Sequence, residues 1–301
     1  MTSPRPSDVL GEIYASWAVE MSRYPDMSIE LLRMIFEDWQ RATAEPEDVT
    51  YRETAIGGVP GILVTPAGCA QEQVLLVMHG GGFALGSPAS HRKLAGHLAK
   101  ACGASAFVAG FRLAPEHPYP AALEDGLAVV DGLLERGHRI EDITPVGDSA
   151  GANLAIAMVL RLMREGRALP AQVITMSPWL DMENTGATLD TNDATDFLIT
   201  REGLQANIDR YLGGTQDPRD PLVNPLHADL SGFPRLYIDA GSVESLLDDA
   251  VRLHELALKH DVDVTFVVGE GMQHVYPFMA GRDANADREI GSIAAWYRAG
   301  R

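Results

Sequence analysis

The spacing of hydrophobic positions changes along the chain, and each spacing predicts a different kind of element. Up to about residue 45, apolar side chains recur every three or four positions, as they do on one face of a helix. Ser7 and Ser28 stand where each of two such helices would begin, and a serine there can cap the first turn. We therefore predict N-terminal helices within residues 1–45, carried by Leu10, Ile13, Tyr14, Trp17, Ala18 and Met21 and then by Leu31, Met34, Ile35 and Trp39.

Beyond residue 46 the pattern predicts strands, first Val49–Ile56 and Gly61–Thr65 around a Gly57-Gly58 turn. Continuous apolar strands then alternate with helices, which is typical of a mostly parallel sheet covered on both faces. We predict an α/β fold whose core spans residues 46–301. Its strands are Val74–His79, Ala104–Ala109, Ile143–Val146, Gln172–Ser177, Arg235–Ala240 and Val262–Val268, and its helices are Ser90–Lys100, Ala121–Arg136, Ala150–Arg164, Ser245–His260 and Asn285–Arg298.

One stretch, at about residues 182–212, interrupts this alternation. It is polar at first and then resumes as a short helix, Thr200–Leu212. An insertion at the carboxyl edge of a parallel sheet is where a lid over an active site would lie.

Composition and charge exclude several classes of partner. The chain has 301 residues, of which 46% are hydrophobic, and no apolar run reaches the ~18 residues of a membrane span. A net charge of −18 disfavours binding to nucleic acid or anionic membranes, which both need a basic surface. Two cysteines, Cys69 and Cys102, exclude a disulfide framework, and the first eight residues lack the features of a secretory signal. We expect a cytoplasmic protein, with a homodimer left open.

The sequence Gly147-Asp148-Ser149-Ala150-Gly151 fits a nucleophile elbow, the sharp strand-to-helix turn of serine hydrolases. The flanking glycines suit such a turn because it leaves no room for Cβ atoms. A predicted strand precedes the motif and a predicted helix follows it, as this turn requires. Ser149 is therefore our candidate nucleophile.

An activated serine needs a histidine as base. Of the histidines after Ser149, His254 and His260 fall in a predicted helix and His227 in a proline-rich loop. His274 follows a predicted strand, in a flexible loop where it can reach the elbow. We expect His274 to be the base.

The acid that orients the histidine is expected after strand Arg235–Ala240. Asp239 belongs to that strand, and Asp248 and Asp249 to the next helix. Glu244 lies in the connecting loop and is the preferred candidate. Position alone does not decide between Glu244 and Asp248, because residues four apart share one helix face.

A second glycine-rich segment, His79-Gly80-Gly81-Gly82, follows another strand. Its backbone N–H groups can stabilise an oxyanion, together with the N–H of Ala150. A phosphate-binding loop is the alternative, but the sequence has neither G-x-G-x-x-G nor a following Lys-Ser/Thr. We expect His79 to be structural.

Several segments together resemble the hormone-sensitive-lipase-like serine esterases, the bacterial family IV carboxylesterases. The similar segments, in chain order, are His79–Phe83, Phe111–Ala121, Gly147–Gly151, Ser177–Trp179 and Met272–His274. The resemblance implies an α/β-hydrolase fold with a helical cap, which is drawn from residues 1–45 and from the insertion at about residues 182–212. It also implies Ser149 as nucleophile, His274 as base, and oxyanion donors at Gly81, Gly82 and Ala150. It implies no metal and no organic cofactor, and gives Arg112 and Glu116 structural roles.

Two departures from the family pattern concern the site. Val275 and Tyr276 replace the Gly-Phe that usually follows the histidine. The usual Asp-Pro-Leu-x-Asp is here Glu244-Ser245-Leu246-Leu247-Asp248, which puts Glu244 in the acid position with a longer side chain.

The expected activity is hydrolysis of small carboxylic esters with short to medium acyl chains through an acyl-enzyme. A lactone hydrolase or an amide deacetylase would use the same residues and stays open. A non-catalytic receptor on this scaffold is disfavoured because His274 is present, and a serine peptidase because no gating domain precedes the hydrolase part. The expected pocket residues are Phe83, Trp179, Trp17 and Tyr24, although helix-to-core packing is an equal explanation for the last two.

Overall fold

The computed structural model describes residues 9–24 and 27–301. These residues contain a central sheet of eight strands. The strand order is β1-β2-β4-β3-β5-β6-β7-β8. Strand β2 runs antiparallel to its neighbours β1 and β4, and the other neighbouring pairs are parallel. The strands are β1 (Val49–Ile56), β2 (Val59–Pro66), β3 (Ala70–Met78), β4 (Ala104–Ala109), β5 (Ile143–Asp148), β6 (Gln172–Met176), β7 (Arg235–Gly241) and β8 (Val264–Gly269).

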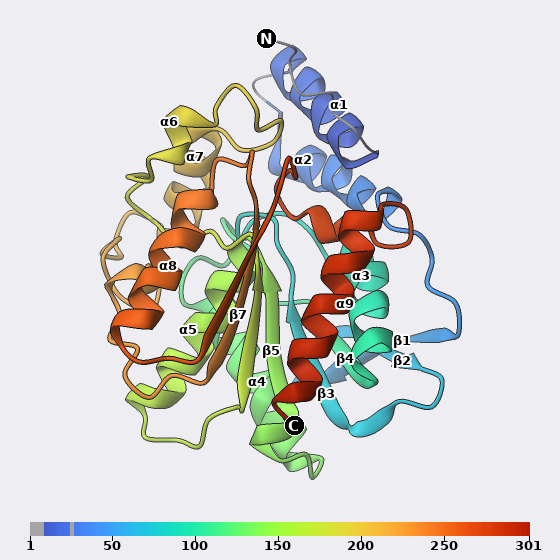
Figure 1. Cartoon of the computed structure of the whole chain (residues 1–301). Coiled ribbons are helices and arrows are strands. Elements are labelled where there is room, and N and C mark those ends of the chain that lie inside the picture. Colours follow the sequence, from blue (N-terminus) through green and yellow to red (C-terminus); the bar gives the residue numbers. More distant parts are fainter. Residues whose placement is uncertain (1–8, 25–26) are drawn as a thin grey trace.

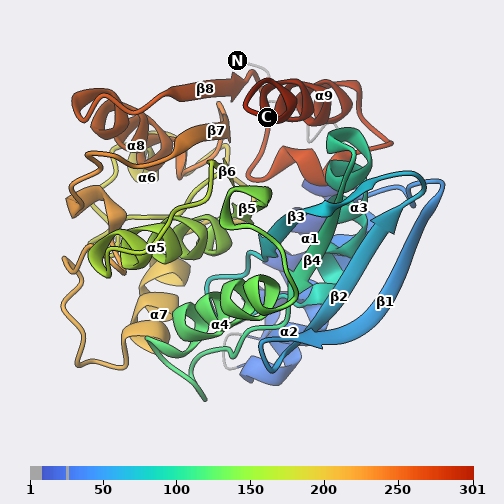
Figure 2. The ribbon, with the colours of Figure 1, turned by 90° about the horizontal axis from the view of Figure 1, so that it is seen from below.

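Helices cover both faces of this sheet (Figure 2). One face packs against α3 (Pro88–Cys102) and α9 (Ala284–Ala299). The other packs against α4 (Ala121–Glu135), α5 (Ala150–Arg164) and α8 (Leu247–Lys259). The predicted α/β architecture is confirmed: apolar strands that are buried on both faces require helices on both sides. Short 3₁₀ helices occupy Ile140–Asp142, Pro225–His227 and Tyr276–Met279.

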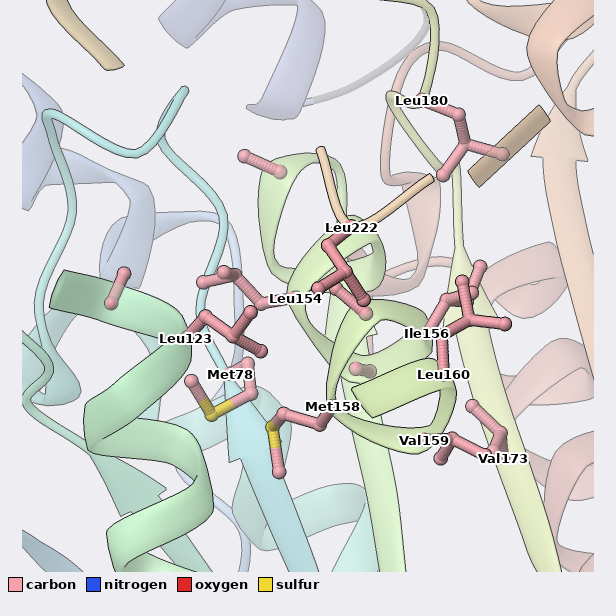
Figure 3. Close-up of a cluster of buried hydrophobic side chains, with 14 of the residues drawn as sticks. Met78, Leu123, Leu154, Ile156, Met158, Val159, Leu160, Val173, Leu180 and Leu222 are labelled. Atoms are coloured by element: carbon pink, nitrogen blue, oxygen red, sulfur yellow. The ribbon is translucent and has the colours of Figure 1, made fainter. Parts of the chain in front are cut away.

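Helix α5 lies at the centre of the larger core cluster (Figure 3). Its Leu154 and Met158 are fully buried near Met78 of β3 and Leu123 of α4. Helix α4 approaches closely at Gly126, where a Cβ atom would stand 2.6 Å from the sulfur of Met158. This dense packing supports the turn that leads into α5.

The N-terminal helices α1 (Val9–Arg23) and α2 (Ile29–Phe36) lie above the end of the sheet to which the central strands point (Figure 1). The Ser28 hydroxyl accepts a hydrogen bond from the backbone N–H of Leu31, so the predicted cap of α2 is present. The other predicted cap, Ser7, lies outside the described residues. Helix α2 ends earlier than expected and continues as the 3₁₀ helix Glu37–Arg41, which holds Trp39.

The insertion forms α6 (Thr188–Thr191) and α7 (Arg201–Leu212). Thr200 caps α7, because its hydroxyl oxygen accepts a hydrogen bond from the N–H of Gly203. The loop between α6 and α7 contacts the turn after β7, where Asn192 Nδ2 donates to the carbonyl of Glu244. Within residues 9–24 and 27–301, no helix combines the length and the apolar character that crossing a bilayer would need.

Candidate active site

The backbone at Ser149 has the strained geometry of an elbow. Ser149 adopts φ 53° and ψ −121° between the end of β5 and the start of α5. A Cβ atom on Gly147 would stand 2.2 Å from the carbonyl oxygen of Gly151, and one on Gly151 would stand 2.0 Å from that of Met78. Both positions therefore require glycine, and the turn presents the Ser149 side chain at the end of the sheet.

His274 lies in the loop between β8 and the 3₁₀ helix Tyr276–Met279, and it is 1% exposed. Its Nδ1 atom is 3.4 Å from Oε1 of Glu244. Its other ring nitrogen, Nε2, is buried and makes no hydrogen bond to any described residue. This nitrogen is the one that would accept a proton from a neighbouring hydroxyl.

Glu244 occupies the turn between β7 and α8 and is fully buried. Its second oxygen, Oε2, accepts hydrogen bonds from the Ser177 hydroxyl at 2.7 Å and from the N–H of Gly241 at 2.8 Å. Asp248 lies in the first turn of α8, where its carboxylate accepts from the N–H of Ala187 at 3.2 Å. The structure therefore brings Glu244, and not Asp248, to His274.

The carboxylates around His274 change its acidity. Burial alone would lower the pKa of His274, but the hydrogen bond and charge of Glu244 outweigh it, with smaller contributions from Asp196 and Asp148. The net result is a pKa raised above the ordinary value of 6.5. A raised pKa means that the folded protein stabilises the imidazolium, the form that a base reaches after taking a proton.

The glycine-rich loop after β3 is shaped by close contacts. Gly81 has φ +116°, and a Cβ on Gly82 would stand 2.3 Å from Nδ2 of Asn207 in α7. Within the described part of the chain, the N–H groups of Gly81, Gly82 and Ala150 donate no hydrogen bond to other protein groups. Three unused donors near the elbow suit a site where negative charge develops.

His79 and Asp148 hold this loop in place. His79 Nδ1 is 2.8 Å from the carbonyl of Gly80, and the ring stacks on Phe111 with centroids 4.2 Å apart. Burial lowers the pKa of His79 to about 3, so the ring is neutral. Asp148 Oδ1 accepts from the N–H of Gly80 at 3.0 Å. These contacts agree with the structural role expected for His79.

The two charged residues expected to be structural both form ion pairs. Arg112 binds Asp125, the closest distance being 2.7 Å, and Glu116 binds Arg33 of α2 at 2.7 Å. Among the described residues, no cluster of three or more His, Cys, Asp or Glu side chains is placed to bind a metal ion.

Two of the expected pocket residues, Phe83 and Trp179, lie close together beside the elbow. The ring of Phe83 stacks on Tyr211 of α7 with centroids 3.7 Å apart and lies 5.5 Å from Trp179. Trp179 follows β6, and its N–H donates to the carbonyl of Ser149 at 3.1 Å. Sequence reasoning missed Tyr211, because nothing in its helix distinguishes it from an ordinary core residue.

The other two expected pocket residues have different surroundings. Trp17 is 2% exposed and stacks on Phe36 at 4.4 Å, within an aromatic cluster that includes Tyr14 and Trp39. This contact is the helix-to-core packing left open above. Tyr24 is 55% exposed beyond the end of α1. Their contribution to a pocket stays a prediction.

Three further residues near the site carried no signal strong enough to assign them a role from sequence. Ser177 stands in a motif shared with the esterases, but its contact with Glu244 depends on the fold. Asp196, in the insertion, accepts from the N–H of Ser245 at 2.6 Å. Tyr14, in α1, donates its hydroxyl proton to the carbonyl of His274 at 2.9 Å, across 260 positions of sequence.

Comparison with known proteins identifies the family. Residues 75–278 match the family model described as α/β hydrolase fold. An acetyl-hydrolase of Streptomyces hygroscopicus is 41% identical over 265 residues, which cover 82% of this chain and 88% of the relative. An esterase of Acinetobacter venetianus is 37% identical and covers 87% and 86%, respectively. The chain belongs to the hormone-sensitive-lipase-like esterases of the α/β-hydrolase fold.

Solved structures agree with this assignment. The crystal structure of an esterase from the bacterial hormone-sensitive lipase family superposes with a TM-score of 0.91 at 33% identity, covering 100% of this chain and 99% of the other. A hormone-sensitive lipase from a metagenome library gives 0.90 at 32% identity. The protein is a carboxylic ester hydrolase, as its motifs predicted.

Proposed function

We propose that Ser149 is the nucleophile, His274 the general base and Glu244 the carboxylate that orients His274. The observation that carries this proposal is the buried contact of 3.4 Å between Glu244 and His274, with the opposite ring nitrogen unbonded. The strained elbow at Ser149 supports the nucleophile, because strain of this kind is kept where a side chain must be exposed to substrate.

In the proposed mechanism, Nε2 of His274 takes the Ser149 hydroxyl proton while the serine oxygen attacks the ester carbonyl carbon. The carbonyl oxygen becomes an oxyanion that accepts hydrogen bonds from the N–H groups of Gly81, Gly82 and Ala150. Collapse of this intermediate breaks the bond to the alcohol oxygen, which leaves with the proton from Nε2. A water molecule then loses a proton to Nε2 as its oxygen attacks the acyl carbonyl carbon. When this second intermediate collapses, the bond to the Ser149 oxygen breaks, Nε2 returns the proton to that oxygen, and the carboxylic acid is released.

The substrate is proposed to be a small ester with a short to medium acyl chain. Three aromatic side chains gather beside the elbow, and α7 brings one of them, Tyr211, against Phe83. Each of the three rings is only 1% exposed, so an acyl site beside them is narrow and favours a compact apolar acyl group over a long one. Two relatives are named as an acetyl-hydrolase and an esterase, which supports the same class.

The experiment that tests this proposal compares three classes of substrate with one enzyme preparation. A series of 4-nitrophenyl esters from acetate to dodecanoate is measured beside a panel of lactones and a panel of acetanilides. We expect the highest kcat/KM on esters of about two to six acyl carbons. A higher kcat/KM on lactones or anilides would replace the ester by that alternative, and Ser149→Ala controls for contaminating hydrolases.

We also predict a cytoplasmic location, and we leave a homodimer open. The location rests on the content of two cysteines, which fits a reducing compartment. The subunit number is measured by sedimentation at concentrations from micromolar upward.

A further inference from the structure

The peptide unit that follows His274 is held at both of its polar ends. The Tyr14 hydroxyl donates to the carbonyl oxygen of His274 at 2.9 Å. The N–H of Val275, which belongs to the same peptide unit, donates to Oγ of Ser177 at 2.9 Å. These two buried hydroxyls, called the peptide clamp below, come from α1 and from the segment after β6, on opposite sides of the His274 loop.

The peptide clamp is part of a longer chain of hydrogen bonds. On one side, Trp39 Nε1 donates to the Tyr14 hydroxyl oxygen at 3.1 Å. On the other side, the Ser177 hydroxyl donates to Oε2 of Glu244 at 2.7 Å. Each hydroxyl therefore accepts one bond and donates the next, so all donors point the same way, from Trp39 towards the carboxylate. Bonds arranged in this sense polarise and strengthen one another.

The backbone on both sides of the peptide clamp needs such support. Val275 has φ 52° and ψ 45°, a left-handed conformation that is strained for a β-branched residue. Ser177 also has a positive φ, of 44°. Glycine could adopt this conformation without strain, whereas valine cannot. In this chain the loop would relax unless its bonds held it.

We propose that Tyr14 and Ser177 are positioning residues that fix the peptide after His274, so that the imidazole stays aligned with Glu244 on one side and Ser149 on the other. Through Tyr14, helix α1 takes part in catalysis and does more than cover the site. The proposal rests on the roles proposed for Ser149, His274 and Glu244.

The geometry of Tyr14 supports a specific role for its hydroxyl. The side chain is fully buried, and its ring packs 5.6 Å from that of Trp17 and 6.5 Å from that of Trp39. Phenylalanine would keep this ring packing and remove the bond to His274. Burial raises the pKa of Tyr14 well above its ordinary value, so the hydroxyl remains a donor throughout the working pH range.

The first experiment compares Tyr14→Phe with Tyr297→Phe. Tyr297 is an equally buried tyrosine whose hydroxyl is 3.1 Å from Gln73, near the start of β3 and away from His274. With 4-nitrophenyl acetate, well below the melting temperature, Tyr14→Phe should lower kcat about tenfold, which is ~1.4 kcal/mol of activation free energy. KM should change by less than about twofold, because the bond acts on the base and not on the substrate.

The second experiment is a double-mutant cycle with Ser177→Ala. Both variants release the same peptide unit, so the kcat loss of the double variant should be clearly smaller than the product of the two single losses. Independent residues would give the product. Trp39→Phe should lower kcat less than Tyr14→Phe does, because it leaves the bond from Tyr14 to His274 intact.

The outcomes separate this proposal from the proposed function. If Tyr14→Phe lowers the melting temperature but keeps the parent kcat, or if Tyr297→Phe loses as much kcat, the hydroxyl is merely structural and the inference is overturned. Multiplicative losses in the cycle would also overturn it. If instead Ser149→Ala kept full activity, the proposed function would fail, whatever the result for Tyr14.

Discussion

Glu244 reaches Nδ1 of His274 with one carboxylate oxygen and binds the N–H of Gly241 and the hydroxyl of Ser177 with the other. The two donors fix the side chain, so its first oxygen is held towards the imidazole. Asp248, four residues later, faces the insertion at Ala187 instead. Helix α8 begins at Leu247, so Glu244 lies in the turn before the helix while Asp248 lies in its first turn.

Replacing each carboxylate by its amide tests this assignment. Glu244→Gln should lower kcat by a factor of roughly 10² to 10⁴, because the amide cannot stabilise the imidazolium and its NH₂ group can face Nδ1. Asp248→Asn should cost much less. The kcat of both variants is measured with 4-nitrophenyl acetate after circular dichroism shows unchanged folding. A larger loss in Asp248→Asn would make that residue the acid.

The pH dependence of kcat/KM follows from the raised pKa of His274. A protonated imidazole cannot accept the serine proton, so kcat/KM falls as the pH drops through this pKa. Since the pKa is raised, the midpoint should lie above 6.5. Glu244→Gln removes the main cause of the increase and should move the midpoint down. If the midpoint of this variant equals that of the parent, Glu244 does not raise the pKa of His274 and the proposed pairing is wrong.

The acyl side of the pocket can be tested at Trp179. Trp179→Ala removes a large ring beside Phe83 and the elbow, so the preference among 4-nitrophenyl esters should shift towards longer acyl chains. Trp296→Phe is a suitable control, since Trp296 belongs to α9 and its ring packs on Tyr237 of β7. An unchanged chain-length profile in Trp179→Ala would place the acyl group elsewhere.

Deleting residues 1–45 tests their assignment to the cap. The sheet contains none of these residues, so it should still fold. The truncation removes Tyr14 from His274 and uncovers Phe278, on which Trp39 stacks at 5.3 Å. We expect a lower kcat, a changed acyl-chain preference and increased binding of an apolar fluorescent dye. A truncated protein with the parent's full selectivity would contradict the cap assignment.

The fold and the positions of Ser149, Glu244 and His274 were predictable because short-range patterns encode them. Buried parallel strands have continuous apolar runs, such as residues 74–78 of β3, and the elbow depends on glycines at fixed offsets from Ser149. The loop positions of Glu244 and His274 then follow from the strand ends.

The contacts made by Tyr14, Ser177 and Asp196 were not predictable in the same way. Tyr14 fits an apolar helical stripe as well as any core residue, and its bond to His274 spans 260 positions. Such long-range pairs depend on how α1 docks, which local periodicity does not describe. The burial of Trp17 has the same origin, because the packing of α1 against α2 places it inside an aromatic cluster.

The most direct test of the account is the fate of Ser149 during turnover. A fluorophosphonate ester should label one residue, Ser149, as identified by mass spectrometry of the peptide that contains it, and labelling should abolish ester hydrolysis in proportion. Ser149→Ala should take up no label, remain folded and lose at least ~10⁴ in kcat. A label on another residue, or near-parent turnover by Ser149→Ala from a preparation free of other esterases, would contradict the account.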